Sequence, residues 1–171
     1  MTERPTVTVA VVMERDFQPN RWEDWRHGIA EVVPDDGAFG AGPRVLRDDG
    51  QLARTLHPGL EIELFADEGE GYWLNLNSPA PCIFVMWRLE EDDQVPRPVV
   101  VTLSYNEAGR MLDAGDHVDN VPMPAEMRDV LIAYTAAHYK PEPRKKVRRN
   151  DPFREGAFRR ESSSGSGESR G

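Results

Sequence analysis

Residues 82–89 read CIFVMWRL, and this stretch decides the fold because it is apolar on both of its faces. Such a strand is typical of the centre of a sheet that is covered on two sides. The run at 60–65 (LEIELF) instead alternates, with Leu60, Ile62 and Leu64 on one face and acidic residues on the other. This period of two is that of a half-buried strand. The sequence therefore predicts a sheet with at least one fully buried strand.

Four further strands and one weaker pair of strands extend this sheet. Asp49-Gly50 is a hairpin signal, because that dipeptide tolerates the positive φ of a tight turn. The additional strands are predicted at 6–13 (TVTVAVVM), 25–33 with a break at Gly28, 72–76 (YWLNL) and 98–105 (PVVVTLSY), with a weaker pair at 43–56 around Asp49-Gly50.

Two helices are predicted after the strands. Ser104 and Glu107 have the spacing of a capping box ahead of a short helix that runs to about Leu112. Pro124 suits the start of a second helix, which ends before Pro141. Strands followed by helices indicate an α+β fold. We expect an antiparallel sheet or partly closed barrel of about six to eight strands, covered by a C-terminal helix.

Charge divides the 171 residues into two parts. The chain has 21 basic and 30 acidic side chains and a formal charge of −9. Ten of the basic and five of the acidic residues lie at 140–171, which leaves 11 basic and 25 acidic residues at 1–139. The body is therefore near −14 and the tail near +5. We expect a folded α+β domain at 1–139 and a basic, disordered tail at 140–171, because the tail has no apolar period to offset the entropy of ordering.

This composition excludes several classes of protein. An acidic body is a poor non-specific binder of nucleic acid, which requires clustered cations. No apolar run approaches the length of a membrane span, and the N-terminus lacks the basic and apolar regions of a secretory signal. The single cysteine, Cys82, cannot form an internal disulfide. These features predict a cytoplasmic protein.

The motifs of common catalytic and metal sites are not found in the sequence. The four histidines stand alone, without a second His or Cys at ligand spacing. Cys82 lies beside an apolar run and is predicted to be a buried thiol rather than a nucleophile. There is no Gly-x-Ser-x-Gly elbow and no phosphate-binding glycine loop. We therefore predict no catalytic residue, metal or cofactor, and favour a non-enzymatic protein over an enzyme.

Polar residues inside apolar segments give one candidate site. Buried amides and guanidinium groups need hydrogen-bond partners. They could bond one another and fix the sheet against the helix, or line a polar groove that recognises a ligand or a partner loop. The candidate residues are Trp73, Asn75, Trp87, Arg88, Asp119 and Asn120.

The tail gives a second candidate site. Its cations would steer association, and its two isolated phenylalanines would anchor it on an acidic partner. The alternatives are a solubilising tail, a salt-sensitive contact with nucleic acid or an anionic membrane, and a tail that lies back on the acidic body. The candidate partner-binding residues are Arg144, Lys145, Lys146, Arg148, Arg149, Phe153 and Phe158.

Several segments together resemble an uncharacterised proteobacterial family known only as a domain of unknown function. The resembling segments are 9–15 (VAVVMER), 56–59 (LHPG), 72–88 (YWLNLNSPAPCIFVMWR), 101–113 (VTLSYNEAGRMLD), 118–124 (VDNVPMP) and 138–144 (HYKPEPR). Members of that family are often encoded near molybdenum-dependent formate dehydrogenases. The resemblance implies an accessory or maturation role by genomic association.

Three hypotheses about function follow. The first is a non-enzymatic accessory or adaptor protein that docks through its basic tail on an acidic redox enzyme or maturation factor. The second is a protein that handles a small molecule or the molybdenum cofactor in the Trp73, Asn75, Trp87 and Arg88 region. The third is nucleic-acid binding through the tail.

Overall fold

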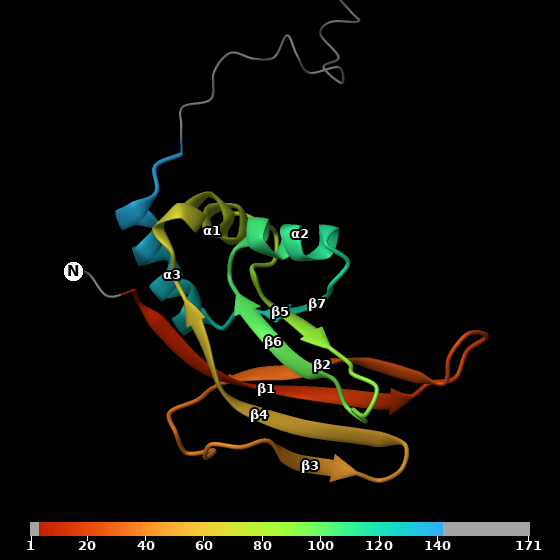
Figure 1. The fold of residues 1–171 in the computed structure, drawn as a ribbon. Helices are drawn as coiled ribbons and strands as arrows, with labels where there is room; N and C mark the ends of the chain where they lie inside the picture. The colour runs from red at the N-terminus through yellow and green to blue at the C-terminus, as the bar shows by residue number, and fades with distance from the viewer. Residues whose placement is uncertain (1–3, 142–171) are drawn as a thin grey trace, which may run out of the picture. The chain divides into compact units, whose positions relative to one another are not determined.

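A computed structural model describes residues 4–141 of the chain and contains two packed sheets and three α-helices there (Figure 1). The elements in chain order are β1 (Thr6–Phe17), β2 (Trp25–Pro34), β3 (Arg44–Asp48), β4 (Leu52–Glu63), a 3-10 helix η1 (Ala66–Glu68), α1 (Gly69–Leu76), β5 (Cys82–Arg88), β6 (Arg97–Thr102), α2 (Tyr105–Asp113), β7 (His117–Pro122) and α3 (Ala125–His138).

The strands form a large sheet and a small sheet. The large sheet has the order β2-β1-β4-β3 and the small sheet the order β6-β5-β7. Neighbouring strands are antiparallel in both sheets. Figure 1 shows the small sheet above the large one, with α1 and α2 over the small sheet. The α+β prediction is confirmed, but the strands form two open sheets and do not close into a barrel.

The main core lies between the two sheets. Val9, Val11 and Met13 of β1 are fully buried there. They pack in one cluster with Ile83 and Val85 of β5, which are also fully buried. Leu131 of α3 joins the same cluster, so the C-terminal helix covers part of the core as predicted.

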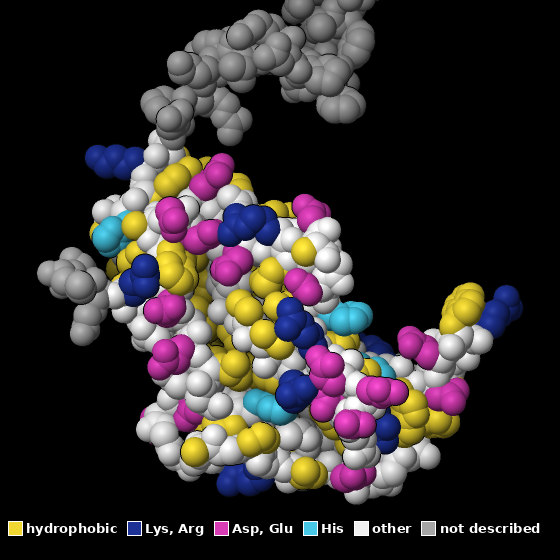
Figure 2. Space-filling view, in the orientation of Figure 1, with side chains coloured by type: hydrophobic (Ala, Val, Ile, Leu, Met, Phe, Trp, Pro, Cys, Tyr) yellow, Lys and Arg dark blue, Asp and Glu magenta, His cyan; other side chains and the backbone are white. Residues whose placement is uncertain are grey.

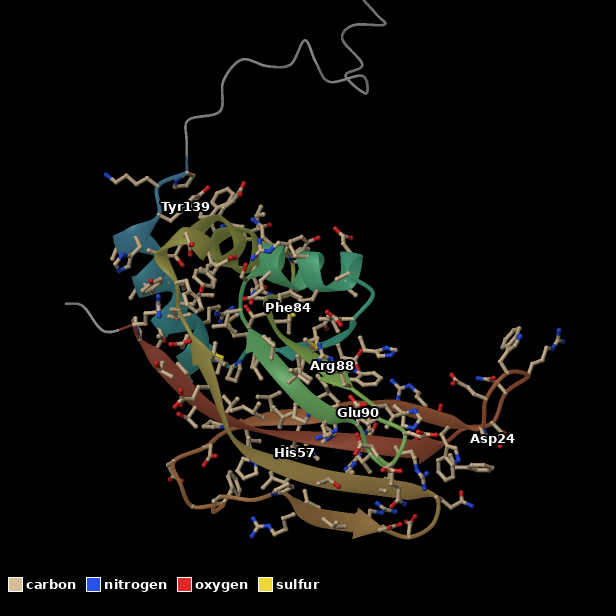
Figure 3. All side chains as sticks on the ribbon, in the orientation of Figure 1. Asp24, His57, Phe84, Arg88, Glu90 and Tyr139 are labelled. Carbon is tan, nitrogen blue, oxygen red and sulfur yellow. The ribbon has the colours of Figure 1, made fainter. Side chains whose placement is uncertain are left out.

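Strand β5 confirms the prediction from residues 82–89. Its odd-numbered residues face the large sheet, whereas Phe84 and Met86 on its other face are 8% and 5% exposed. The Phe84 ring packs edge-on against Tyr105 of α2, with centroids 6.3 Å apart (Figure 3). The strand therefore lies between the large sheet and α2.

The hairpin at 43–56 is also confirmed. Gly50 has φ of +87°, as the Asp-Gly signal predicts. The Asp49 carboxylate accepts hydrogen bonds from the backbone N–H groups of Leu52 and Gln51, at 2.8 and 2.9 Å. These two bonds hold the pKa of Asp49 well below its usual value, and the bond from Leu52 has the larger effect.

The strand predicted at 72–76 is wrong, because these residues form the end of helix α1. Two glycines near the start of α1 lower its helix propensity but permit close packing. A Cβ on Gly71 would collide with the Ser104 side chain, and one on Gly69 would lie 2.6 Å from Tyr139 Cβ. The helix is therefore stabilised by contacts with residues far away in the sequence.

Strand β7 was not predicted. Residues 117–122 contain Asp119 and Asn120 and end in a proline, so they lack the apolar alternation of a strand. The segment pairs with β5 from Cys82↔Pro122 to Trp87↔His117. Its position at the edge of the small sheet explains why polar residues are tolerated there.

The two predicted helices are confirmed, with one change in the cap of α2. Ser104 Oγ accepts a hydrogen bond from Glu107 N at 3.0 Å, as in a capping box. The Glu107 carboxylate accepts from Thr102 Oγ1 at 2.6 Å instead of reaching back to Ser104. Thr102 Oγ1 in turn accepts from Ser104 N at 3.1 Å, so the threonine completes the cap.

The close approach of α1 to the cap of α2 predicts opposite effects of two Gly→Ala substitutions. Gly71→Ala should lower the free energy of unfolding by about 1–3 kcal/mol, because the new methyl group overpacks the contact. Gly109→Ala on α2 is the matched control, since an added Cβ there meets nothing within 4 Å. It should raise the free energy of unfolding by about 0.5–1 kcal/mol. Urea denaturation measures both, and stabilisation by Gly71→Ala would contradict the packing.

Candidate functional site

Asn75, a predicted groove residue, is 1% exposed and bonded entirely to the main chain. Its Nδ2 donates to the carbonyl oxygens of Cys82 and Leu103, both at 2.8 Å. Its Oδ1 accepts from Cys82 N at 3.1 Å. Asn75 thus joins α1 to the start of β5 and the end of β6. This geometry supports the structural interpretation of its amide.

Trp87 lies near the other end of β5, well away from Asn75. It is 6% exposed and stacks on His117, with ring centroids 4.2 Å apart and an interplanar angle of 8°. Trp73 instead packs against Tyr139, at 6.4 Å between centroids. Figure 3 shows Tyr139 beside α1 and Arg88 at the far end of β5. The structure does not bring Trp73 and Asn75 together with Trp87 and Arg88.

Asp119 and Asn120 are neighbours on β7, so their side chains point to opposite faces of the small sheet. Asp119 approaches β2, where a Cβ on Gly28 would lie 2.7 Å from its Oδ2. Asn120 pairs with Phe84 across the strands and is exposed. The six predicted groove residues therefore lie at several separate places in the fold.

The predicted partner-binding residues of the tail lie outside the described residues. They are Arg144, Lys145, Lys146, Arg148, Arg149, Phe153 and Phe158.

Two half-buried titratable groups have the properties of structural residues. Burial raises the pKa of the Cys82 thiol, which opposes formation of a reactive thiolate. Burial also lowers the pKa of His57, and the nearby Arg97 lowers it further. Within residues 4–141, no three His, Cys, Asp or Glu side chains come together as a set of metal ligands.

The structure shows a groove where β4 and β6 run past each other, which we call the strand-edge groove. It has a volume of about 440 Å³. Its walls combine hydrophobic side chains with three carboxylates, and Figure 2 shows hydrophobic surface flanked by acidic side chains in this part of the molecule. The lining residues are Gly59, Leu60, Glu61, Glu63, Phe65, Val99, Val100, Val101 and Glu107.

Both strands present a free edge at this groove. Strand β3 pairs with β4 only from Ala53 to Leu56, so the second half of β4 has β1 as its single partner among the described strands. Strand β6 is the outer strand of the small sheet. The main-chain groups at such edges are available to pair with an added segment.

The bend of β4 opens its edge. Val9 pairs with Leu60 and Val11 with His57, so Pro58 and Gly59 form a bulge. Gly59 has φ of +78°, and its N–H donates to Asp35 Oδ2 at 2.8 Å. The bulge turns the last residues of β4 away from β3.

The main-chain polar groups of Glu61 and Glu63 point away from β1. Leu64 N donates to Pro5 O at 3.0 Å, which places the N–H of Leu64 on the β1 side. Backbone groups alternate sides along a strand, so those of Glu61 and Glu63 lie on the free edge. The groove therefore offers hydrogen-bonding groups of the backbone as well as carboxylates.

The three carboxylates are differently engaged. Glu107 is held in the cap of α2 by Thr102. Glu63 lies 4.0 Å from Arg4 in an exposed, weak ion pair. Glu61 forms no ion pair with any residue of 4–141. The groove thus keeps negative charge that a basic ligand could neutralise.

A family model described as "Protein of unknown function (DUF3305)" matches residues 8–148. The chain belongs to the DUF3305 family. The match begins within β1 and extends past α3. No curated protein and no solved structure matches the chain.

The strand-edge groove of this DUF3305 protein was missed by the sequence analysis. The alternation of Leu60, Glu61, Ile62 and Glu63 placed both carboxylates on one face of a strand. This alternation could not show that β3 ends before these residues of β4, nor that β6 lies alongside them. None of the helices in the described part of the DUF3305 chain has the length and hydrophobicity needed to cross a lipid bilayer.

The structural role of Asn75 predicts a large loss of stability on truncation. Asn75→Ala removes the three hydrogen bonds of a buried amide and should lower the free energy of unfolding by about 2–4 kcal/mol. Asn77→Ala is the control, since the exposed Asn77 makes one bond, to Trp73 O, and its loss should cost less than about 1 kcal/mol. Chemical denaturation distinguishes the two, and equal losses would argue against the anchoring role.

Proposed function

We propose that this DUF3305 protein is a non-enzymatic adaptor that binds an extended, basic segment of a partner protein in the strand-edge groove. The observation that carries the proposal is the meeting of two free strand edges beside three carboxylates and an apolar floor. Strand edges bind peptides through the main chain, and the adjoining side-chain pockets select the sequence.

Each feature of the groove has a part in this recognition. The outward N–H and C=O groups of Glu61 and Glu63 pair with the backbone of the segment. Leu60 and Val99 contact its apolar side chains, and Val99 is 41% exposed in the free protein. The carboxylates of the groove favour Lys or Arg at alternate positions of the bound segment. Acidic residues also keep the free edge from pairing with other acidic strands.

The partner that we propose is a formate dehydrogenase-type molybdoenzyme or one of its maturation factors. Support comes from the resemblance of residues 72–88 and the other segments to a family encoded near such enzymes. The basic residues at 144–149, with Phe153 and Phe158, would provide a second contact to an acidic surface of the same partner. The cytoplasmic location expected from the single cysteine is part of this proposal.

The two alternative functions have less support. Cofactor binding by Trp73, Asn75, Trp87 and Arg88 requires side chains that lie at separate places, and the Asn75 amide is already bonded. Nucleic-acid binding through the tail predicts an affinity that falls steeply with salt.

Charge reversal in the groove tests the adaptor function. The full-length protein is immobilised, and binding of the purified formate dehydrogenase holoenzyme and its maturation factors from the same organism is measured by surface plasmon resonance. Glu61→Lys with Glu63→Lys should weaken binding at least about tenfold, because the basic segment is then repelled. Glu90→Lys with Glu91→Lys is the matched control, with the same change of charge in the exposed loop after β5.

The outcomes separate the parts of the proposal. Equal binding by the two double variants would show that the strand-edge groove is not the binding site. If none of these proteins bound the wild type, the assigned partner would be overturned. A third full-length variant, with Arg144, Lys145, Lys146, Arg148 and Arg149 changed to Gln, measures the contribution of the tail. Binding unchanged by this variant would confine recognition to the groove.

A further inference from the structure

The hairpin between β1 and β2 presents a tryptophan to solvent at its tip. Trp22 is 83% exposed. Asn20 Oδ1 accepts hydrogen bonds from Trp22 N and Glu23 N, at 2.7 and 2.9 Å. Asn20 N donates to Glu23 O at 2.7 Å. The turn is therefore ordered, and Trp22 is exposed because the turn holds it there.

The stem below this tip is stabilised by aromatic and cationic side chains. The Arg15 guanidinium lies 3.7 Å from the centre of the Trp25 ring. Phe17 packs edge-on against the same ring, with centroids 5.0 Å apart. Figure 3 shows Asp24 at this end of the large sheet, and Figure 2 shows a hydrophobic and a basic side chain at the projecting tip. We call residues 17–25 the aromatic arm.

A small apolar groove lies on the face of the large sheet opposite the main core, and we call it the outer-face groove. It has a volume of about 280 Å³. Pockets for drug-sized ligands occupy about 300–1,000 Å³, so this groove suits one large side chain. The lining residues are Val12, Glu31, Val33, Phe39, Arg44, Leu46, Arg54 and Leu56.

An ordered loop builds one wall of this groove. Phe39 lies between Gly37 and Gly40, whose φ angles are +97° and +86°. The Asp35 and Asp36 carboxylates accept from the N–H groups of Gly37 and Ala38, at 2.8 and 3.0 Å. The loop thereby holds the Phe39 ring against a second cluster of buried residues, which includes Val12.

Charged side chains of both signs border the groove and the arm: the rim carries Arg44, Arg54 and Glu31, and the arm carries Arg21 together with two acids beside Trp22. Arg44 forms no ion pair with any residue in the described range, while Arg54 Nε donates to Glu14 at 2.9 Å. Glu23 and Asp24 directly follow Trp22 in the arm. The same chain therefore carries an aromatic side chain with Arg21 on one side and two acids on the other, and an apolar groove bordered by two arginines and Glu31.

We propose that this protein associates with a second copy of itself by inserting Trp22 of one copy into the outer-face groove of the other. Glu23 and Asp24 would then meet Arg44 on the rim, and the Glu31 carboxylate offers an acceptor for the indole N–H. A buried aromatic anchor within a ring of weaker contacts is the usual centre of an interface. The contact can be reciprocal about a two-fold axis, each copy giving one Trp22 and one groove.

This interface goes beyond the adaptor function and leaves its groove unoccupied. The strand-edge groove and the outer-face groove share no lining residue. A dimer would display two strand-edge grooves, so that one assembly could hold two segments of a partner and bind by avidity.

The mass of the full-length protein in solution tests the proposal. Sedimentation equilibrium and light scattering over a wide range of concentrations should show a dimer that dissociates on dilution. Trp22→Ala should raise the dissociation constant about thirtyfold or more, as loss of a hot spot does. Leu46→Glu should do the same, because it places a negative charge on the groove rim, where Leu46 is 50% exposed.

Two controls make the test specific. Tyr105→Ala removes an aromatic side chain that is 54% exposed on α2, outside both surfaces, and should leave the dissociation constant unchanged. An equimolar mixture of the Trp22→Ala and Leu46→Glu proteins should associate more tightly than either alone, since one intact groove and one intact Trp22 remain. A mass that keeps rising beyond two copies would support the same contact used head to tail. A wild type that is monomeric throughout, a Trp22→Ala protein as associated as the wild type, or a mixture that fails to associate would each overturn the proposal.

Discussion

Strand β5 buries side chains on both of its faces, and this double burial positions the other elements around it. Ile83 and Val85 pack against the large sheet, while Phe84 and Met86 lie on the side of α2. Each buried side chain of this size contributes about 1.5–3 kcal/mol. Because both faces must be covered, β5 takes the centre of the small sheet, and β6 and β7 become its edges.

The ends of β5 and β6 are held to α1 by polar contacts. Asn75 ties α1 to Cys82 and Leu103, and the Glu68 carboxylate of η1 accepts from Ser104 Oγ at 2.6 Å and from Arg110 Nη2 at 2.6 Å. These bonds keep the helices over the small sheet. The edge of β6 is then left beside the bent half of β4, and the strand-edge groove results from this arrangement.

The two surfaces proposed for binding differ in the physics of recognition. The strand-edge groove combines main-chain groups with carboxylates and suits an extended basic segment. The aromatic arm and the outer-face groove combine one large aromatic side chain with an apolar hole and suit a folded copy of the chain. The charges also differ, since the charged residues of the strand-edge groove are all carboxylates, whereas the outer-face groove carries two arginines and one glutamate. A single chain could therefore dimerise and bind a partner without competition between the two.

The sequence by itself determined the class of fold, the central strand, the hairpin at Asp49-Gly50 and the helix that begins after Ser104. Each of these rests on local chemistry: apolar periodicity, the backbone freedom of glycine, and a side-chain cap. Only the tertiary structure decided that residues 72–76 are helical, that Asn75 bonds main chain instead of lining a groove, and that β7 exists. Contacts with residues distant in sequence stabilise these features, such as Ser104 against Gly71 and β5 against β7. The strand-edge groove likewise depends on where β3 ends and where β6 packs, and local residue patterns do not encode either position.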